Sequence, residues 1–187
     1  MTETIADKEK EIRLKKKELK KMKKELKGMK KELRERKKAE LEDLLSDYIN
    51  HPKVREMRSF TQHGSITTYD HCERVAEMSL KLNRRFRIGA DEEKLAVGAL
   101  LHDFYLYDWH DDDGGSHRLH GFTHPEQARQ NAVEVFDIDE KEQEIIRTHM
   151  WPLTLSAIPK SREAAIVCLA DKWCSLQETL FMRWFFT

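Results

Sequence analysis

Apolar residues in the first forty positions recur about once in seven, within a stretch that is otherwise mostly charged. They are Ile5, Ile12, Leu19, Leu26 and Leu33. This period predicts one long helix over residues 3–40. Lys8, Lys15 and Arg36 occupy positions that a second apolar seam would need, so the coiled-coil seam is incomplete. We expect a solvated, charged helix whose narrow apolar stripe can be buried only against a partner.

After residue 40, apolar residues recur at intervals of three and four, as in helices that pack one face on a core. Helices are expected over residues 41–49, 68–86, 91–103 and 139–149, and two more open at Thr123 and Ser161. His51-Pro52 and Trp151-Pro152 interrupt this pattern, because helical backbone is disfavoured before a proline. No stretch alternates with period two, so the expected fold class is an all-α helical bundle.

Capping residues define the expected helix starts. Asp91, Asp139 and Ser161 each precede a helical pattern and can accept hydrogen bonds from free backbone N–H groups. The segment Thr123–Glu126 is similar to a capping box with proline in the first turn, which predicts a helix opening there. Asp108–Gly121 is polar and contains adjacent glycines. We expect it to be a loop whose surface or lid residues include His110, His117 and His120.

The net charge is zero, but the charge is unevenly distributed. Residues 1–40 contain 17 Lys and Arg against 9 Asp and Glu, whereas the remainder contains 17 against 25. We therefore expect a basic helical arm, residues 1–40, joined to an acidic domain, residues 41–187. No apolar run reaches the roughly 20 residues that span a bilayer. With no signal-peptide core and three cysteines expected as free thiols, we expect a cytoplasmic protein without membrane contact.

His71, His102 and Asp171 lie on helix faces that are otherwise apolar. A lone core histidine is usually only hydrogen-bonded, and Asp171 beside Lys172 could form a surface pair. The adjacent His102 and Asp103 differ, because two such side chains at the end of a buried helix need a shared partner. An unpaired buried carboxylate is costly, so these groups are expected to meet one another or a metal ion. Imidazole with carboxylate suits iron, manganese or zinc better than magnesium.

Five segments resemble the successive motifs of HD-domain proteins: TYDHCERVAEMS, LLHDFYLY, GFTHPEQA, THMWP and LADKWCSLQE. The resemblance covers roughly residues 63–180 and leaves the N-terminal arm outside. It implies an all-α, metal-dependent domain of a family whose members are mostly phosphohydrolases. The minimal signature has four ligands, and members that hold two metal ions add two histidines before the final aspartate. This longer pattern is matched in order by His71, His102, Asp103, His124, His149 and Asp171.

The resemblance also implies a role for each ligand. The four signature residues would hold a first ion, and His124 and His149 would hold a second, with Asp103 bridging. One or two divalent transition-metal ions are expected, iron or manganese foremost, with zinc, nickel, cobalt or magnesium left open. Two ions about 3.5–4 Å apart can activate a water and stabilise charge on phosphate oxygens. Glu178, seven residues after Asp171, is expected to support a ligand histidine.

The chain departs from the family pattern directly after the HD pair. Some members continue it as HD-x-G-K, with a lysine that contacts the substrate phosphate, but no lysine follows Asp103 in this way. A cyclic-dinucleotide phosphodiesterase is therefore not expected. Arg147 and Lys172 are the remaining candidates for a phosphate contact, although either could face solvent. With Asp103 they form the expected catalytic set, and His63 and Gly64 are expected near the entrance.

We therefore interpret the chain as a metal-dependent phosphohydrolase. It would hydrolyse a phosphate ester of a small molecule, with a nucleotide as the foremost candidate, by metal-activated water. Two alternatives stay open: the same ligands could hold a mixed-valence diiron centre that activates oxygen, or the basic helix could serve a non-catalytic binding or scaffold protein. The expected partners are a small phosphorylated substrate and a second copy of the chain, joined through the N-terminal helix. Nucleic acid is not an expected partner.

Overall fold

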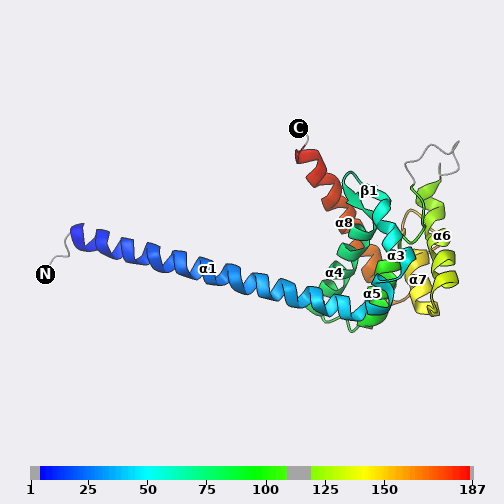
Figure 1. The fold of residues 1–187 in the computed structure, drawn as a ribbon, viewed down its shortest axis with the longest axis horizontal. Helices are drawn as coiled ribbons and strands as arrows, with labels where there is room; N and C mark the ends of the chain where they lie inside the picture. The colour runs from blue at the N-terminus through cyan, green and yellow to red at the C-terminus, as the bar shows by residue number, and fades with distance from the viewer. Residues whose placement is uncertain (1–4, 109–118, 186–187) are drawn as a thin grey trace. The chain divides into compact units, whose positions relative to one another are not determined.

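The computed structural model describes residues 5–108 and 119–185 (Figure 1). Their contacts divide the chain into two compact units, Met1–Glu40 and Leu41–Thr187. The first unit is formed by α1 (Ile5–Leu44), which continues four residues beyond it. The expected long N-terminal helix is therefore confirmed, and it is longer than the periodicity indicated. Within the described residues, no helix combines the length and apolar character needed to cross a membrane.

The apolar stripe of α1 remains exposed to solvent. Its described members are each about half exposed, from 51% to 53%: Ile12, Leu19, Leu26 and Leu33. Ion pairs between residues four apart run along the same helix, such as that of Arg36 with Glu40 at 3.0 Å. Such exposed pairs stabilise a helix only by a few tenths of a kcal/mol each. In the first unit, α1 is thus a solvated, charge-laced helix, as its sequence predicts.

The second unit is an all-α domain, as expected. Its first residues, Leu41 and Leu45, are buried in the core. Two short helices follow, α2 (Ser46–Ile49) and α3 (Pro52–Glu56), with a single 3-10 turn, η1 (Met57–Ser59). The main helices are α4 (Thr68–Phe86), α5 (Glu92–Leu101), α6 (His120–Val135), α7 (Glu140–Thr148) and α8 (Arg162–Phe185).

The helix α5 lies at the centre of this domain. All seven residues from Leu95 to Leu101 are fully buried. Helices α4, α6, α7 and α8 all contact it. A helix that is apolar on every side is stable only when other elements surround it. Because α5 is surrounded, the residues that follow its C-terminal end begin inside the domain.

The expected capping residues are present at three helix starts. Asp91 accepts hydrogen bonds from the backbone N–H groups of Glu93 and Lys94 at 3.1 and 3.2 Å. Asp139 forms a complete capping box at the start of α7. Ser161 accepts from the backbone N–H of the residue three positions later, at 3.1 Å. Each cap satisfies N–H groups that the first helical turn leaves without partners.

The predicted start of α6 at Thr123 is wrong. The helix begins at His120, and Pro125 lies inside it. Thr123 does not cap the helix, because its hydroxyl donates instead to the Leu119 carbonyl oxygen at 3.1 Å. A threonine can make this backward bond as readily as a capping bond, so the motif alone did not distinguish them. His110 and His117 lie outside the described residues.

A short antiparallel sheet is a second difference from the expected fold. Strand β1 (Thr61–His63) pairs with β2 (Ile66–Thr67) immediately before α4. Gly64 takes a positive φ of 59° between the strands, a conformation that glycine adopts without strain. Strands of two and three residues are too short to show a recognisable alternation, which is why the sequence did not reveal them.

Gly98 allows α5 and α7 to approach each other closely. A Cβ atom at this position would lie 2.6 Å from Ile145 Cδ1 and 2.8 Å from its Cγ2. Ile145 is itself fully buried, so it cannot move aside freely. Because Gly98 has no side chain, α5 and α7 can come this close together at this point.

We predict that Gly98→Ala destabilises the second unit by about 1–3 kcal/mol, the usual cost of overpacking a core. This cost exceeds the gain of about 0.5–1 kcal/mol that alanine brings to a helix in place of glycine. Urea unfolding followed by tryptophan fluorescence measures it, because all four tryptophans lie after residue 100. Gly28→Ala is the control, since no atom lies within 4 Å of the added Cβ. Equal stability of the two variants would contradict the prediction.

Candidate metal centre

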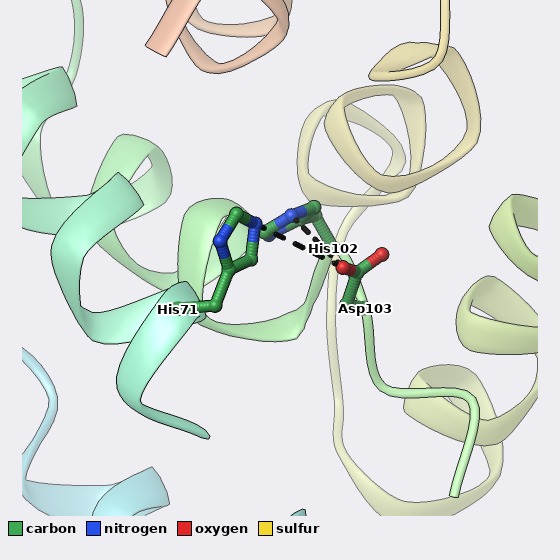
Figure 2. A group of neighbouring side chains, drawn as sticks. All are labelled: His71, His102 and Asp103. Carbon is green, nitrogen blue, oxygen red and sulfur yellow. Dashed lines mark ion pairs between the residues drawn. The ribbon is translucent and has the colours of Figure 1, made fainter. Parts of the chain in front are cut away.

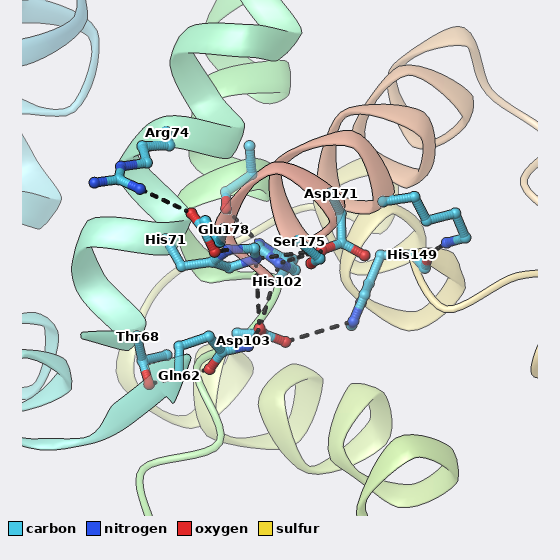
Figure 3. Close-up of polar contacts among 12 residues, drawn as sticks. Gln62, Thr68, His71, Arg74, His102, Asp103, His149, Asp171, Ser175 and Glu178 are labelled. Atoms are coloured by element: carbon cyan, nitrogen blue, oxygen red, sulfur yellow. Dashed lines mark hydrogen bonds and ion pairs between the residues drawn. The ribbon is translucent and has the colours of Figure 1, made fainter. Parts of the chain in front are cut away.

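Six imidazole and carboxylate side chains, carried on or directly after five helices, converge inside the second unit, and Figure 3 labels all of them except His124. Each is at most 7% exposed. They are His71 on α4, His102 and Asp103 after α5, His124 on α6, His149 after α7 and Asp171 on α8. Their ligand atoms form three overlapping groups within which all atoms lie inside 4.8 Å of one another. One of these groups, His71 with His102 and Asp103, is drawn in Figure 2.

Backbone carbonyl groups fix three of the histidine rings. The Nδ1 atoms of His102, His124 and His149 each lie 2.7 Å from the carbonyl oxygen of a residue three or four positions earlier. A carbonyl oxygen can only accept, so each Nδ1 must carry the proton. In the neutral ring, Nε2 is then a lone pair directed into the centre. This is the tautomer that a metal ligand needs.

Unshared electron pairs face one another in this centre. His124 Nε2 lies 2.8 Å from His149 Nε2, although neither atom carries a proton in this tautomer. His102 Nε2 and Asp103 Oδ1 are buried without a hydrogen-bond partner in the described part of the chain. Two acceptors at such a distance repel each other unless a proton or a cation lies between them. The donor set therefore fits a metal ion of the kind that imidazole and carboxylate ligands bind together.

The two oxygens of Asp103 face different histidines. Oδ2 lies 3.5 Å from His102 Nε2 and 4.0 Å from His71 Nε2. Oδ1 lies 3.2 Å from His124 Nε2 and 3.5 Å from His149 Nε2. Ligands about 2.1 Å from a shared ion are separated by about 3–4 Å, so all four distances suit ligation. The carboxylate stands where a bridging ligand between two ions would stand.

Glu178 holds His71 from the side opposite the centre. Its Oε2 lies 2.9 Å from His71 Nδ1, while His71 Nε2 lies 3.2 Å from Asp171 Oδ1. Arg74 pairs with the other oxygen of Glu178 at 3.3 Å, and Ser175 donates to Asp171 at 3.2 Å (Figure 3). The expected contact between Glu178 and a ligand histidine is thus present. A carboxylate in this position makes the imidazole a stronger ligand.

The charges of the centre are strongly coupled. Burial opposes the ionisation of Asp103, but electrostatic interactions with the neighbouring His102 and His124 hold its pKa well below the usual value. Burial likewise opposes protonation of His71, yet its hydrogen bonds to Asp171 and Glu178 raise its pKa to about 10. Burial and the neighbouring His102 and His124 lower the pKa of His149 to about 3. His149 therefore keeps a free lone pair at neutral pH.

Sequence reasoning missed a hydrogen-bonded group that touches Asp103. Gln62 in β1 donates from Nε2 to Asp103 Oδ2 at 2.7 Å. Tyr105 donates to the amide oxygen of Gln62 at 2.6 Å, and Thr68 donates to it at 3.3 Å. Burial and the Asp103 charge raise the pKa of Tyr105 far above its usual value, so its hydroxyl remains a donor. Tyr105 occupies the segment in which the chain departs from the HD-x-G-K pattern.

The structure separates the two candidate phosphate contacts. Lys172 lines a hollow of about 560 Å³ beside Asp171, but its amino group already donates to the His149 carbonyl oxygen at 2.8 Å. It also lies 3.3 Å from the Cys168 carbonyl oxygen. Arg147 is exposed and lines a different hollow on α6 and α7, so the structure does not bring it to the centre.

Two other histidines were predicted near the entrance or in a loop. The side chain of His63 lies outside the described part of the chain. His120 is not a loop residue, because it opens α6 and its ring stacks on that of His124 with centroids 4.5 Å apart. The Tyr107 hydroxyl lies 2.9 Å from His120 Nδ1. His120 thus helps to cover the centre on the side of α6.

We predict that Glu178→Ala weakens metal binding by about 10- to 100-fold, the usual effect of losing a group that orients a ligand histidine. The reason is that the His71 ring would lose the acceptor at Nδ1. A titration with Mn²⁺ measures the dissociation constant. Glu77→Ala, an exposed change on the same helix as His71, is the matched control. A dissociation constant equal to that of the wild type would contradict a supporting role for Glu178.

Comparison with known proteins agrees with this geometry. The family model described as HD domain matches residues 68–175, which include all six side chains of the centre. No curated protein matches the chain. The matched range covers more than half of the sequence and begins at the first residue of α4. It also contains the three overlapping groups of potential ligand atoms. The chain therefore belongs to the HD domain family, a metal-dependent superfamily of hydrolase type.

Proposed function

We propose that the chain is a metal-dependent phosphohydrolase that acts on a phosphate ester of a small molecule. The observation that carries this proposal is the facing of bare acceptor atoms, above all His124 Nε2 and His149 Nε2 at 2.8 Å. A structural core has no reason to gather acceptors without donors, because each buried unpaired group costs about 1–3 kcal/mol. A hydrolytic metal centre requires that arrangement.

The proposal assigns the ligands to two neighbouring sites. His71, His102 and Asp171 would share one ion with Asp103 Oδ2. His124 and His149 would share the other with Asp103 Oδ1. The first site then has four protein ligands and the second has three, so the second should bind its ion more weakly. Iron and manganese are the foremost candidates, because both accept mixed imidazole and carboxylate ligands.

Bound ions would supply a hydrolytic water of lowered pKa and positive charge beside the phosphate oxygens. The protein's own residues provide the remaining functions. Asp103 keeps the two sites adjacent, and the carbonyl bonds at Nδ1 orient the imidazoles so that Nε2 points into the centre. The nucleophile needs no side chain. This agrees with the three cysteines, whose thiols are buried rather than exposed for reaction.

The substrate would enter through the hollow that Asp171 shares with the centre. Its other lining residues are Met150, Pro152, Leu153, Lys172 and Ser175. Three of these are apolar, so the hollow suits a small molecule with an apolar or aromatic part, and a nucleotide is one such molecule. Lys172 would contact the phosphate only by giving up one of its present bonds, to the His149 or Cys168 carbonyl oxygen or to the Cys168 sulfur. Arg147 could contribute only to a part of the substrate that extends beyond the hollow.

A second candidate is a mixed-valence diiron oxygenase that uses the same six ligands. It is favoured by the engagement of the Lys172 amino group, which leaves the hollow without an obvious phosphate contact. Iron content together with oxygen uptake separates the two candidates. A phosphohydrolase should turn over equally well with and without oxygen, whereas an oxygenase should stop.

We predict that wild-type protein purified without chelators carries between one and two transition-metal ions per chain. His102→Ala should remove most of this metal, because His102 belongs to two of the three overlapping groups of potential ligand atoms. His149→Ala should retain about one ion and lose most phosphatase activity, because only the second site depends on it. Elemental analysis and a phosphatase and phosphodiesterase screen on the same samples measure these effects.

His51→Ala is the control for these histidine variants, because His51 caps α3 and is not among the six converging residues. It should keep the wild-type metal content. A wild-type protein that stays metal-free after reconstitution would overturn the proposed function. Full activity and two ions in His149→Ala would overturn the assignment of two sites.

The helix α1 is proposed to join two copies of the chain. We predict that deletion of residues 1–40 reduces the number of chains per particle in solution, while the metal content and the turnover of each chain stay unchanged. The physical reason is that the deletion removes the exposed stripe of Leu19, Leu26 and Leu33 but none of the six converging residues. Light scattering after size exclusion measures the mass. An unchanged number of chains per particle would exclude association through α1.

A further inference from the structure

The hairpin before α4 carries a buried glutamine whose amide reaches the carboxylate between the two sites (Figure 3). Gln62 lies at the irregular point of the sheet, between its two residue pairs. Irregularities of this kind redirect a side chain out of the strand pattern. We propose that Gln62 is a positioning residue that fixes the Asp103 carboxylate so that each of its oxygens faces a separate metal site. This inference rests on the proposed function.

The orientation of the Gln62 amide is determined by its surroundings. Its Oε1 accepts hydrogen bonds from the hydroxyls of Tyr105 at 2.6 Å and Thr68 at 3.3 Å. Because two donors occupy the oxygen end, the NH₂ end faces Asp103. Gln62, Thr68 and Tyr105 are at most 8% exposed, so water does not compete for these bonds. The amide therefore presents one defined donor to Asp103.

That donor decides how the carboxylate is turned. A carboxylate rotates easily about its last bond, since this torsion has no sharp minima. Among the residues that the structure describes, Asp103 Oδ1 has no hydrogen-bond partner, whereas Oδ2 accepts from Gln62 at 2.7 Å. With this one bond in place, Oδ2 stays near His102 and Oδ1 stays near His124. Without the bond from Gln62, the carboxylate would be free to rotate, and one of its oxygens would move away from the pair of histidines that it faces.

The loss should be unequal between the two sites. Asp103 is one of four protein ligands at the first site, but one of only three at the second. A misdirected oxygen therefore removes a larger share of the second site's ligands. A residue that only supported the fold would lower the stability of the protein and weaken both sites together. The unequal loss is thus the signature of positioning.

The experiment compares Gln62→Leu with the wild type by Mn²⁺ titration, resolving two dissociation constants. We expect the tighter constant to be unchanged and the weaker one to rise about 10- to 100-fold. Gln143→Leu is the matched control, because it removes a glutamine whose side chain bonds Arg129 and the Ile138 carbonyl oxygen on the outer side of α7. Thermal unfolding of all metal-free proteins checks that each variant is folded.

Unchanged constants in folded Gln62→Leu would overturn the inference, and so would an equal weakening of both sites. If Gln62→Leu does not fold, Tyr105→Phe decides, since it removes only the hydroxyl that holds the amide oxygen. It should weaken the second site alone, by less than Gln62→Leu would, and no change would overturn the inference. Absence of metal binding in the wild type would instead overturn the proposed function, and the inference with it.

Discussion

Four imidazole nitrogens and two carboxylates share one buried volume, and the repulsion among their electron pairs has to be offset there. Protons can do this in part, as the raised pKa of His71 indicates. Between His124 and His149, whose Nδ1 protons are already committed to backbone carbonyl groups and whose Nε2 atoms are 2.8 Å apart, a further proton would place a charged imidazole in the buried centre. Divalent cations bound at the two proposed sites would offset the repulsion among all six groups. The chemistry that we propose follows from this constraint.

The fold delivers two of the ligand histidines at the C-terminal ends of helices. His102 and His149 are the C-cap residues of α5 and α7, and each ring bonds a carbonyl group in the last turn of its own helix. These carbonyl groups have no backbone N–H partner within the helix. The bond from Nδ1 therefore satisfies the carbonyl group and orients the ligand ring at the same time. The close approach at Gly98 then brings the two helices together. Packing and ligand geometry are therefore set by the same contacts.

The residues around the ligands adapt a common family arrangement to this chain. Glu178 on α8 orients His71, and Gln62 on the hairpin contacts Asp103. Tyr105, the second residue after the HD pair, donates a hydrogen bond that holds Gln62 in place. Some family members instead continue from the HD pair toward a lysine that contacts the substrate. Lys172, the nearest cation in the hollow, donates to the end of α7. Among the described residues around the centre, more side chains hold the ligands in place than are available to contact a phosphate group.

The sequence alone was sufficient for the helical class, most helix boundaries and the six converging side chains. The apolar period and the caps at Asp91, Asp139 and Ser161 gave the class and the boundaries, whereas the full set of six followed from the resemblance to the ordered motifs of HD-domain proteins. It was misleading at Thr123, where one hydroxyl has two equally local bonds to choose from. Tertiary structure decided which atoms face each other, that Gln62 contacts a residue 41 positions away, and that Lys172 and Arg147 lie in different hollows. Such facts depend on distances between elements far apart in the chain, which the spacing of residues along one helix does not contain.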